Sequence, residues 1–221
     1  MTPFIKICGL KTPAAIDAAL RAGASHAGFM VFEKSPRHVS LDEMRALGPR
    51  TGAMKRAAVL VNSADETIRD VVAALSPHLL QLHGDEAPDR VAAIRALTGL
   101  PVMKVLPVAT AADVAAARSY GAADLIMFDA KAPKGADRPG GNGVTFDWAL
   151  LKDVQLGAPW ILSGGLNDAN VAEAVRQTGA GGVDVSSGVE DAPGVKSPQR
   201  IAAFTAAARA AYGLPVLDHA L

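Results

Sequence analysis

The chain has 221 residues, half of them apolar and a fifth charged, which predicts one domain with a substantial buried core. Its 22 basic residues balance 22 acidic ones, so no overall field favours nucleic acid or an anionic membrane, and neither partner is expected. No apolar run approaches the ~20 residues that cross a bilayer, and no signal-peptide hydrophobic region is present. A single cysteine cannot form an internal disulfide, so we expect a cytoplasmic protein.

Short apolar runs typical of β-strands alternate along the chain with alanine-rich stretches of helical spacing. Eight strands are predicted: FIKIC (4–8), HAGFMVF (26–32), KRAAVLV (55–61), LLQLH (79–83), PVMKVL (101–106), DLIMFD (124–129), PWILS (159–163) and GVDVSS (182–187). Eight helices are predicted: PAAIDAALRAG, LDEMRALG, ADETIRDVVAAL, APDRVAAIRAL, TAADVAAARSYG, FDWALLKDV, NDANVAEAVRQTG and SPQRIAAFTAAARAAYG. Residues 213–221 are expected to form a tail after the last helix.

Residues that favour helix termini support several of these helices. Signals for helix starts are Thr12 with Pro13, Ser63 with Glu66, and Asn167 or Asp168. Signals for helix ends are Gly23, Gly121 and Gly179.

Strict alternation of strands and helices predicts parallel strands covered by helices. An eightfold repeat in 221 residues favours an α/β fold with a single closed (β/α)8 barrel, a TIM barrel, over residues 1–221. An open doubly wound sheet is the alternative, because sequence alone does not show closure.

In such barrels the chemistry lies at the C-terminal ends of the strands. Side chains alternate across a strand, which places four pairs on the inward face: Lys6 and Cys8, Gln81 and His83, Met127 and Asp129, and Asp184 and Ser186. The apolar residues between them would face the helices. We also expect Lys104 to point inward and to join Lys6 and Asp184 in a buried charge network that raises the local positive potential.

Two glycine-rich loops follow the last two strands, LSGGL (162–166), which is expected to open a helix, and DVSSGVE (184–190). Glycines let backbone N–H groups approach a ligand closely, and N–H groups at a helix start bind anions. Barrels often hold a substrate phosphate in these two loops. We therefore predict a phosphate site at Gly164, Gly165, Ser186, Ser187 and Gly188.

Other residues are chemically ambiguous. Cys8 is either a reagent or buried packing. Asp129 ends an apolar run, so desolvation would favour its neutral form and suit a general acid, although it could simply cap the next loop. His83 is either a proton carrier or an orienting hydrogen-bond partner. Arg37 has a planar fork suited to a carboxylate or phosphate, the alternative being a solvated surface arginine.

The loop after the sixth predicted strand, residues 130–143, is longer than a usual connection of roughly 2–6 residues. Its glycines, prolines and charges predict a mobile cover over the barrel mouth. No second histidine or cysteine lies at a spacing that suggests a metal site, so no metal is expected.

The motifs KICGL, GFMVFEKSPRHVS, QLHGDE, LIMFDAK, GGNGVTFDW, LSGGL, GVDVSSGVE and PGVK occur in the order and spacing of the phosphoribosylanthranilate isomerases of tryptophan biosynthesis. The chain resembles this family from about residue 4 to residue 210. The resemblance implies a (β/α)8 barrel that needs no cofactor. It also implies an Amadori rearrangement of N-(5-phosphoribosyl)anthranilate to 1-(2-carboxyphenylamino)-1-deoxyribulose 5-phosphate.

Carried over by position, the resemblance implies that Cys8 is the general base, Asp129 the general acid, and Arg37 the partner of the anthranilate carboxylate. Gln81 and His83 would contact substrate. The loops with Gly164–Gly165 and Ser186–Gly188 would cradle its phosphate, and Lys6 with Asp184 would give electrostatic support. The chain departs from the family pattern at Lys11, Asn142 and Ser197.

Two other functions fit parts of the sequence. Another phosphosugar barrel is one, although an indole-glycerol-phosphate synthase would use lysine and glutamate and a ribulose-phosphate epimerase metal-binding histidines. A non-catalytic sensor of a phosphorylated metabolite is the other, although it would have lost the acid or the base. We expect a monomer that binds a small phosphorylated substrate.

Overall fold

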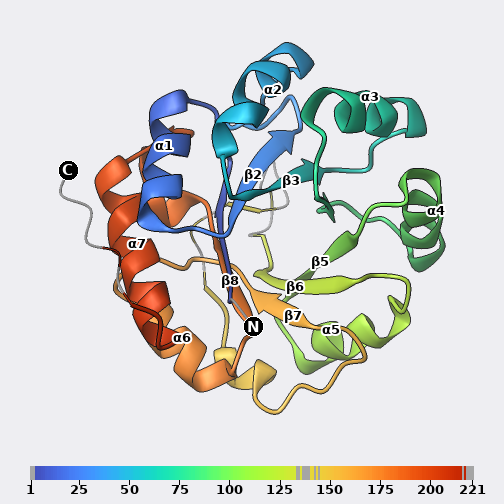
Figure 1. Cartoon of the computed structure of the whole chain (residues 1–221). Coiled ribbons are helices and arrows are strands. Elements are labelled where there is room, and N and C mark those ends of the chain that lie inside the picture. The colour runs from blue at the N-terminus through green and yellow to red at the C-terminus, as the bar shows by residue number, and fades with distance from the viewer. Residues whose placement is uncertain are drawn as a thin grey trace.

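A computed structural model describes residues 3–132, 135, 140, 141, 143, 145–215 and 217. In this part of the chain eight parallel strands close into a barrel in sequence order (Figure 1). They are β1 (Phe4–Cys8), β2 (His26–Val31), β3 (Lys55–Leu60), β4 (Leu79–Leu82), β5 (Val102–Val108), β6 (Leu125–Ala130), β7 (Trp160–Leu162) and β8 (Gly182–Val185). The predicted (β/α)8 barrel is confirmed, and the open sheet is wrong.

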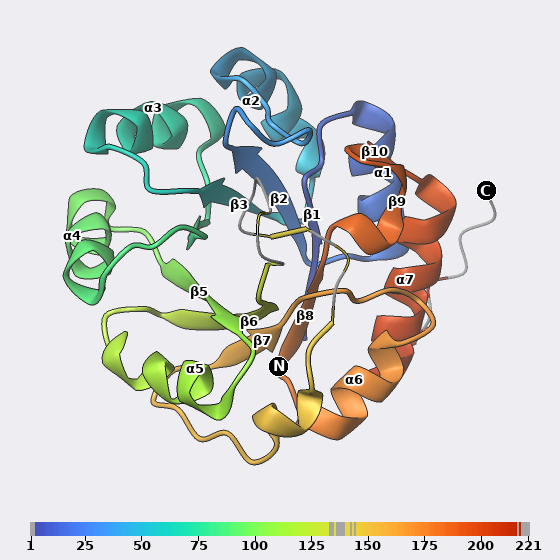
Figure 2. The ribbon, with the colours of Figure 1, turned by 180° about the vertical axis from the view of Figure 1, so that it is seen from behind.

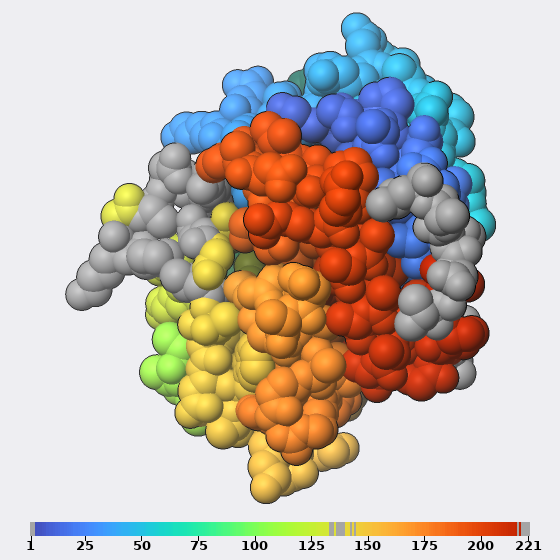
Figure 3. All heavy atoms as spheres, turned by 90° about the vertical axis from the view of Figure 1, so that its left-hand side faces the viewer, coloured from blue at the N-terminus to red at the C-terminus, as the bar shows by residue number. Residues whose placement is uncertain are grey.

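Helices surround the barrel on the outside (Figures 1 and 2). They are α1 (Pro13–Ala22), α2 (Leu41–Leu47), α3 (Asp65–Leu75), α4 (Pro88–Thr98), α5 (Ala111–Ala115), α6 (Val171–Thr178) and α7 (Pro198–Ala211). The last helix, α7, packs beside the first, α1, and beside α6, which completes the ring (Figure 3). No helix in the described part of the chain is long and apolar enough to cross a membrane.

Short elements connect the others. Four are 3-10 helices: η1 (Gly48–Thr51), η2 (Ala116–Ser119), η3 (Trp148–Leu151) and η4 (Ser187–Val189). The sequence did not predict the antiparallel hairpin of β9 (Glu190–Ala192) and β10 (Val195–Lys196), which follows β8 and lies near the mouth of the barrel (Figure 2).

Two predicted helices are wrong or shortened. FDWALLKDV forms only η3. Its backbone N–H groups donate to the carbonyl oxygen three residues earlier, as in a 3-10 helix, and Asp153, with a left-handed φ of 58°, stops further winding. TAADVAAARSYG divides into α5 and η2, so Gly121 caps no helix.

The predicted helix caps have mixed outcomes. Thr12 caps α1, and Gly23 and Gly179 end α1 and α6 in the left-handed conformation, as expected. Ser63 is no cap, since Ala64 takes that place in α3. α6 begins only at Val171, because the side chain of Asn167 accepts from the next backbone N–H groups and forms a turn first.

The pleat of the strands separates two apolar regions. The barrel interior holds Ala57, Leu79, Met103, Val105, Met127 and Ile161. The layer between strands and helices holds the residues predicted to face outward, Ile5, Ile7, Leu80, Leu82, Ile126, Phe128, Val183 and Val185. The predicted alternation is therefore confirmed in β1, β4, β6 and β8.

The inward direction predicted for Lys104 is wrong. The parallel register pairs Gln81 with Met103, so the odd-numbered residues of β5 face the interior. Lys104 therefore lies on the helix side, where Nζ donates to Glu86 Oε2 at 2.7 Å and to Gly84 O at 2.6 Å. The ion pair of Lys104 with Glu86 holds the loop after β4, and this loop begins with His83 of the candidate site.

The predicted tail begins against the body of the protein. Arg209 in α7 donates to Pro215 O at 2.9 Å and to Gly23 O at 3.3 Å. Residues 216 and 218–221 of the tail lie outside the described residues.

His26, at the N-terminal end of β2, gives the fold a dependence on pH. Its ring stacks on Phe4 at 3.8 Å, and burial, with smaller contributions from the charges of Lys6 and Lys55, lowers the pKa of His26 from 6.5 to about 3. The unfolded chain therefore binds a proton before the folded chain does. Stability that is present above pH 6.5 is lost as the pH falls towards about 3.

We expect His26→Phe, which keeps the stacking ring and removes the titrating group, to weaken this dependence. Between pH 6.5 and about 5, the free energy of unfolding of the wild type should fall by about 1.5 kcal/mol more than that of the variant. Urea unfolding at the two pH values measures the difference. Equal losses in both proteins would contradict the lowered pKa.

Candidate active site

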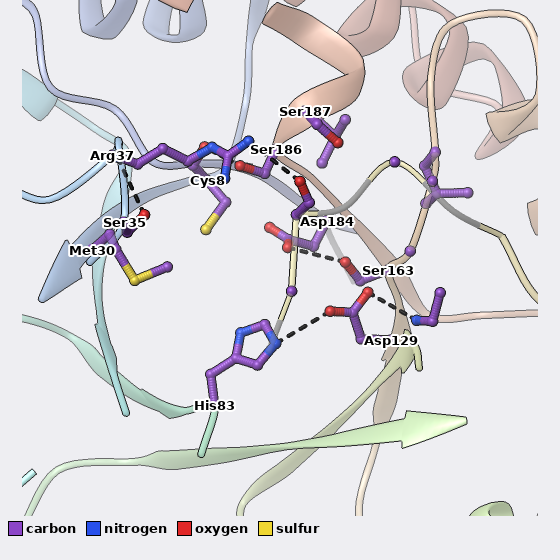
Figure 4. Close-up of a pocket in the computed structure, with 18 of the residues that line it drawn as sticks. Cys8, Met30, Ser35, Arg37, His83, Asp129, Ser163, Asp184, Ser186 and Ser187 are labelled. Atoms are coloured by element: carbon purple, nitrogen blue, oxygen red, sulfur yellow. Dashed lines mark hydrogen bonds and ion pairs between the residues drawn. The ribbon is translucent and has the colours of Figure 1, made fainter. Parts of the chain in front are cut away.

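A cavity that is open to solvent lies at the C-terminal ends of the strands. Most predicted site residues line it: Cys8, Arg37, His83, Asp129, Gly164, Gly165, Asp184, Ser186 and Ser187 (Figure 4). Lys6, Gln81 and Gly188 lie next to it without lining it. Barrel geometry thus brings together side chains from five strand ends and one loop.

Cys8 ends β1 and is only 5% exposed. Lys6 shares its face of the strand, and its Nζ forms an ion pair with Asp184 Oδ1, whose partner oxygen Oδ2 accepts from Ser163 Oγ at 3.3 Å. Burial raises the pKa of the Cys8 thiol; the charges of Lys6 and Lys196 oppose this, and that of Asp184 adds to it. The thiol is therefore buried and depends on nearby cations to ionise.

β2 leaves room for this thiol at Gly28. A Cβ at that position would lie 3.1 Å from Cys8 Sγ and 3.3 Å from Lys6 Cε. The register of β1 with β2 sets Gly28 directly beside Cys8. The absence of a side chain at Gly28 therefore leaves space for the Cys8 thiol.

Asp129 ends a chain of polar side chains across the barrel. His83 Nε2 lies 3.2 Å from Asp129 Oδ2 (Figure 4). On the other side of the ring, Gln81 Nε2 lies 3.3 Å from His83 Nδ1. Nδ1 of the ring thus faces the Gln81 amide, and Nε2 faces the Asp129 carboxyl group. The backbone N–H of Ala130 donates to Asp129 Oδ1 at 2.9 Å. The contact of His83 with Asp129 is compatible with both roles that the sequence left open for this histidine, a proton carrier and an orienting hydrogen-bond partner.

Two glycines of the predicted cover loop lie directly against these groups. A Cβ at Gly140 would lie 2.7 Å from the His83 ring and 2.9 Å from Asp129 Oδ2. A Cβ at Gly141 would lie 2.7 Å from Arg37 Nη1. A larger residue at Gly140 or Gly141 would therefore require the side chains of His83, Asp129 or Arg37 to shift. Positions 133–134, 136–139 and 142 lie outside the described residues, so the mobility expected for this loop stays a prediction.

Arg37 is buried, which rules out a solvated surface arginine. Nε donates to Glu190 Oε1 at 2.7 Å and Nη2 donates to Glu190 Oε2 at 2.8 Å. Glu190 also accepts from Lys196 Nζ at 2.7 Å. Sequence patterns did not identify Glu190 and Lys196, although both lie in quoted motifs, because they gave no sign of the hairpin that brings them to Arg37.

The two predicted phosphate loops lie side by side. Gly164 and Gly165 have left-handed φ values of 92° and 62°, and a Cβ at Gly164 would lie 2.5 Å from the backbone nitrogen of Ala130. A Cβ at Gly188 would overlap the carbonyl oxygen of Leu166, so Gly188 lets the loop after β8 touch the loop after β7. The expectation that LSGGL opens a helix is wrong, since α6 starts at Val171. Residues of the loop after β7 and the start of η4 border this side of the cavity, and the N-terminus of α6 does not.

A family model described as N-(5'phosphoribosyl)anthranilate (PRA) isomerase matches residues 5–207. An N-(5'-phosphoribosyl)anthranilate isomerase of Rhodopseudomonas palustris (strain BisB18) is 58% identical over 218 residues, which cover 98% of this chain and 100% of the relative. The enzyme of Rhizobium etli (strain CIAT 652) is 54% identical over 206 residues, 92% of this chain and 93% of the relative. The chain belongs to this family.

Solved structures agree. The crystal structure of phosphoribosyl anthranilate isomerase from Thermotoga maritima has a TM-score of 0.84 at 31% identity, covering 95% of this chain and 100% of that one. A structure of a PRA isomerase in complex with reduced 1-(o-carboxyphenylamino)-1-deoxyribulose 5-phosphate has a TM-score of 0.81 at 29% identity, with the same coverage. The resemblance drawn from the sequence is confirmed, and with it the enzyme class, an isomerase of tryptophan biosynthesis.

The departures from the PRA isomerase pattern support loops at the site. Lys11 Nζ donates to Pro36 O at 3.0 Å and steadies the loop that carries Arg37. The backbone N–H of Ser197 donates to Val189 O at 3.0 Å. Asn142 lies outside the described residues.

We expect Gly188→Ala to separate the two glycine-rich loops, because its methyl group would overlap the Leu166 carbonyl. Overpacking of this kind costs about 1–3 kcal/mol of stability, and it should also weaken binding of inorganic phosphate. Urea unfolding and phosphate titration measure the two effects.

Gly157→Ala is the matched control, since nothing lies within 4 Å of a Cβ there and its backbone is not left-handed. Its effect should stay within about 0.5 kcal/mol. Phosphate binding by Gly188→Ala equal to that of the control would show that the loop contact does not shape an anion site.

Proposed function

We propose that this protein converts N-(5'-phosphoribosyl)anthranilate to 1-(o-carboxyphenylamino)-1-deoxyribulose 5-phosphate, with Asp129 as general acid and Cys8 as general base. The observation that carries the proposal is that a carboxyl group on β6 and a thiol on β1 line one cavity together with Arg37 and the two glycine-rich loops. Acid and base thus come from separated strands, which leaves room for a sugar between them.

The first step is ring opening. Asp129 gives a proton to the ribose ring oxygen, the bond from that oxygen to C1 breaks, and the nitrogen lone pair forms a protonated Schiff base at C1. The resulting Asp129 carboxylate keeps its hydrogen bonds from His83 Nε2 and from the N–H of Ala130. Charge that develops on the acid is therefore met by donors that are already in place.

The second step is proton removal from C2. The Cys8 thiolate takes the proton, and the electrons of the C–H bond form a C1–C2 double bond as the Schiff-base nitrogen becomes neutral. The enolamine then tautomerises, so that the C2 hydroxyl loses its proton and C1 gains one, which gives the ketose. No oxidant, metal or nucleotide takes part, and the protons balance.

Substrate binding uses opposite sides of the cavity. Glu190 occupies the Nε and Nη2 edge of Arg37, while Nη1 lies beside Gly141 at the cavity wall. That remaining edge suits the carboxylate of the anthranilate ring. The loops with Gly164, Gly165 and Ser187 would receive the phosphate at the other end.

The decisive assay follows the loss of anthranilate-type fluorescence after phosphoribosylanthranilate is generated in situ, without added metal or nucleotide. The wild type should consume the substrate. Cys8→Ala and Asp129→Asn should each lower kcat by about 10²-fold or more, because each removes one proton transfer.

Asp153→Asn, an exposed position with a left-handed backbone that asparagine accepts, is the matched control and should keep full activity. Activity retained by Cys8→Ala or Asp129→Asn would contradict the assigned roles. No fluorescence loss with the wild type would contradict the proposed reaction and favour a sensor or a different phosphosugar isomerase.

A further inference from the structure

Arg37, Glu190 and Lys196 form a buried cluster, here called the Glu190 cluster, at the edge of the cavity. The three side chains are between 2% and 4% exposed. Glu190 Oε1 accepts from both Arg37 Nε and Lys196 Nζ at 2.7 Å, and Oε2 accepts from Arg37 Nη2 at 2.8 Å and from the N–H of Gly194 at 3.2 Å. One carboxylate therefore joins two cations.

Lys196 also connects this cluster to the thiol. Its Nζ donates to Ser186 O at 2.9 Å and to Ser186 Oγ at 3.3 Å, and Ser186 Oγ in turn donates to the backbone oxygen of Cys8 at 3.2 Å. Ser186 and Cys8 end neighbouring strands, and Lys196 lies on the hairpin that follows them. The chain of contacts thus runs from Arg37 through Glu190 and Lys196 to the strand end that carries the thiol.

The cluster holds one more positive charge than negative. No second carboxylate of the described residues lies within ion-pair distance of Arg37 or Lys196. By contrast, Lys6 and Asp184 neutralise each other beside Cys8. An unbalanced buried charge is costly unless an anion lies nearby. Two anions of the reaction can meet it, the Cys8 thiolate and the substrate carboxylate.

We propose that Lys196 is a positioning residue that favours the thiolate of Cys8, while Glu190 holds Arg37 with its remaining edge toward the cavity. This division of work rests on the reaction proposed above. The charged groups that face Cys8 are Lys6 on its own strand, Asp184 on β8, Lys196 on β10 and Arg37 on the loop after β2. Among the three cations, Lys196 shares its carboxylate partner, Glu190, with Arg37, whereas Lys6 is paired with Asp184.

The two roles separate by variant. Lys196→Met removes a positive charge near the thiol but leaves both Arg37–Glu190 hydrogen bonds in place. Glu190→Gln instead removes the carboxylate whose two oxygens accept hydrogen bonds from Nε and Nη2 of Arg37. The first change should act on ionisation of the base and the second on binding of the carboxylate.

The ultraviolet absorbance of the thiolate, measured without substrate, tests the first role. The chain has only one cysteine, so subtraction of the Cys8→Ser protein isolates its titration. We expect Lys196→Met to raise the apparent thiol pKa by about one unit, a roughly tenfold smaller thiolate fraction at neutral pH. Lys196→Arg, which keeps the charge, should keep the apparent thiol pKa close to that of the wild type. The exposed control Lys152→Met should leave the thiol pKa unchanged.

Kinetics tests the second role. Glu190→Gln should raise KM about tenfold or more with a smaller change in kcat, whereas Lys196→Met should lower kcat about tenfold with a smaller change in KM. If Lys196→Met does not fold, Lys196→Gln carries the same test.

An unchanged thiol pKa in the folded Lys196 variant would overturn the role of Lys196, and an unchanged KM in Glu190→Gln would overturn that of Glu190. The thiol titration needs no turnover, so it decides the electrostatic role even if the wild type fails the isomerase assay. That failure would refute the reaction itself.

Discussion

The site depends on closure of the barrel by β1 against β8. Their parallel register sets Lys6 opposite Asp184 and Ile7 opposite Val185, so the first strand ends beside the last. Cys8, 178 residues from Ser186 in sequence, is thereby joined to it by a hydrogen bond. Without closure, the thiol would lie at an open sheet edge, far from the loop after β8. The ion pair of Lys6 with Asp184 fills the barrel at this seam, where two apolar side chains would remove the positive charge of Lys6 from beside the thiol.

Buried charge is the main energetic expense of this arrangement. An ion that is buried away from water loses hydration free energy of several kcal/mol. Only a closely placed partner of opposite charge compensates for that loss. Each buried cation here has a carboxylate within hydrogen-bond distance, as Lys104 does with Glu86 and Lys196 with Glu190. The first pair lies outside the barrel wall and fixes a loop, and the second lies at the edge of the cavity, beside Arg37 and Ser186. Such fixed charges suit a reaction whose substrate carries two anionic groups, because they need no rearrangement when it binds.

Features that depend on local patterns could be predicted well from the sequence. Alternation along a strand is a property of the chain itself, so the sequence alone places Cys8 and Asp129 at inward strand ends. Lys104 shows the limit of this reasoning, since which parity faces inward in β5 is decided by its register with β4. Glu190 and Lys196 were missed for a related reason. Glu190 contacts Arg37, which lies 153 residues earlier, and Lys196 contacts Glu190; both are brought there by a short hairpin that has no strong periodicity.

The base in the proposed reaction, Cys8, is a buried thiol, and its surroundings suit that role. Burial raises the pKa of Cys8, and a base with a higher pKa accepts a proton from carbon more readily once it is ionised. The cost is a smaller thiolate fraction, which Lys6 and Lys196 offset from two sides of the sulfur. The protonated Schiff base would add a third cation only after ring opening. The thiolate is thus favoured most when the C2 proton is most acidic, which couples the action of Asp129 on one strand to that of Cys8 on another.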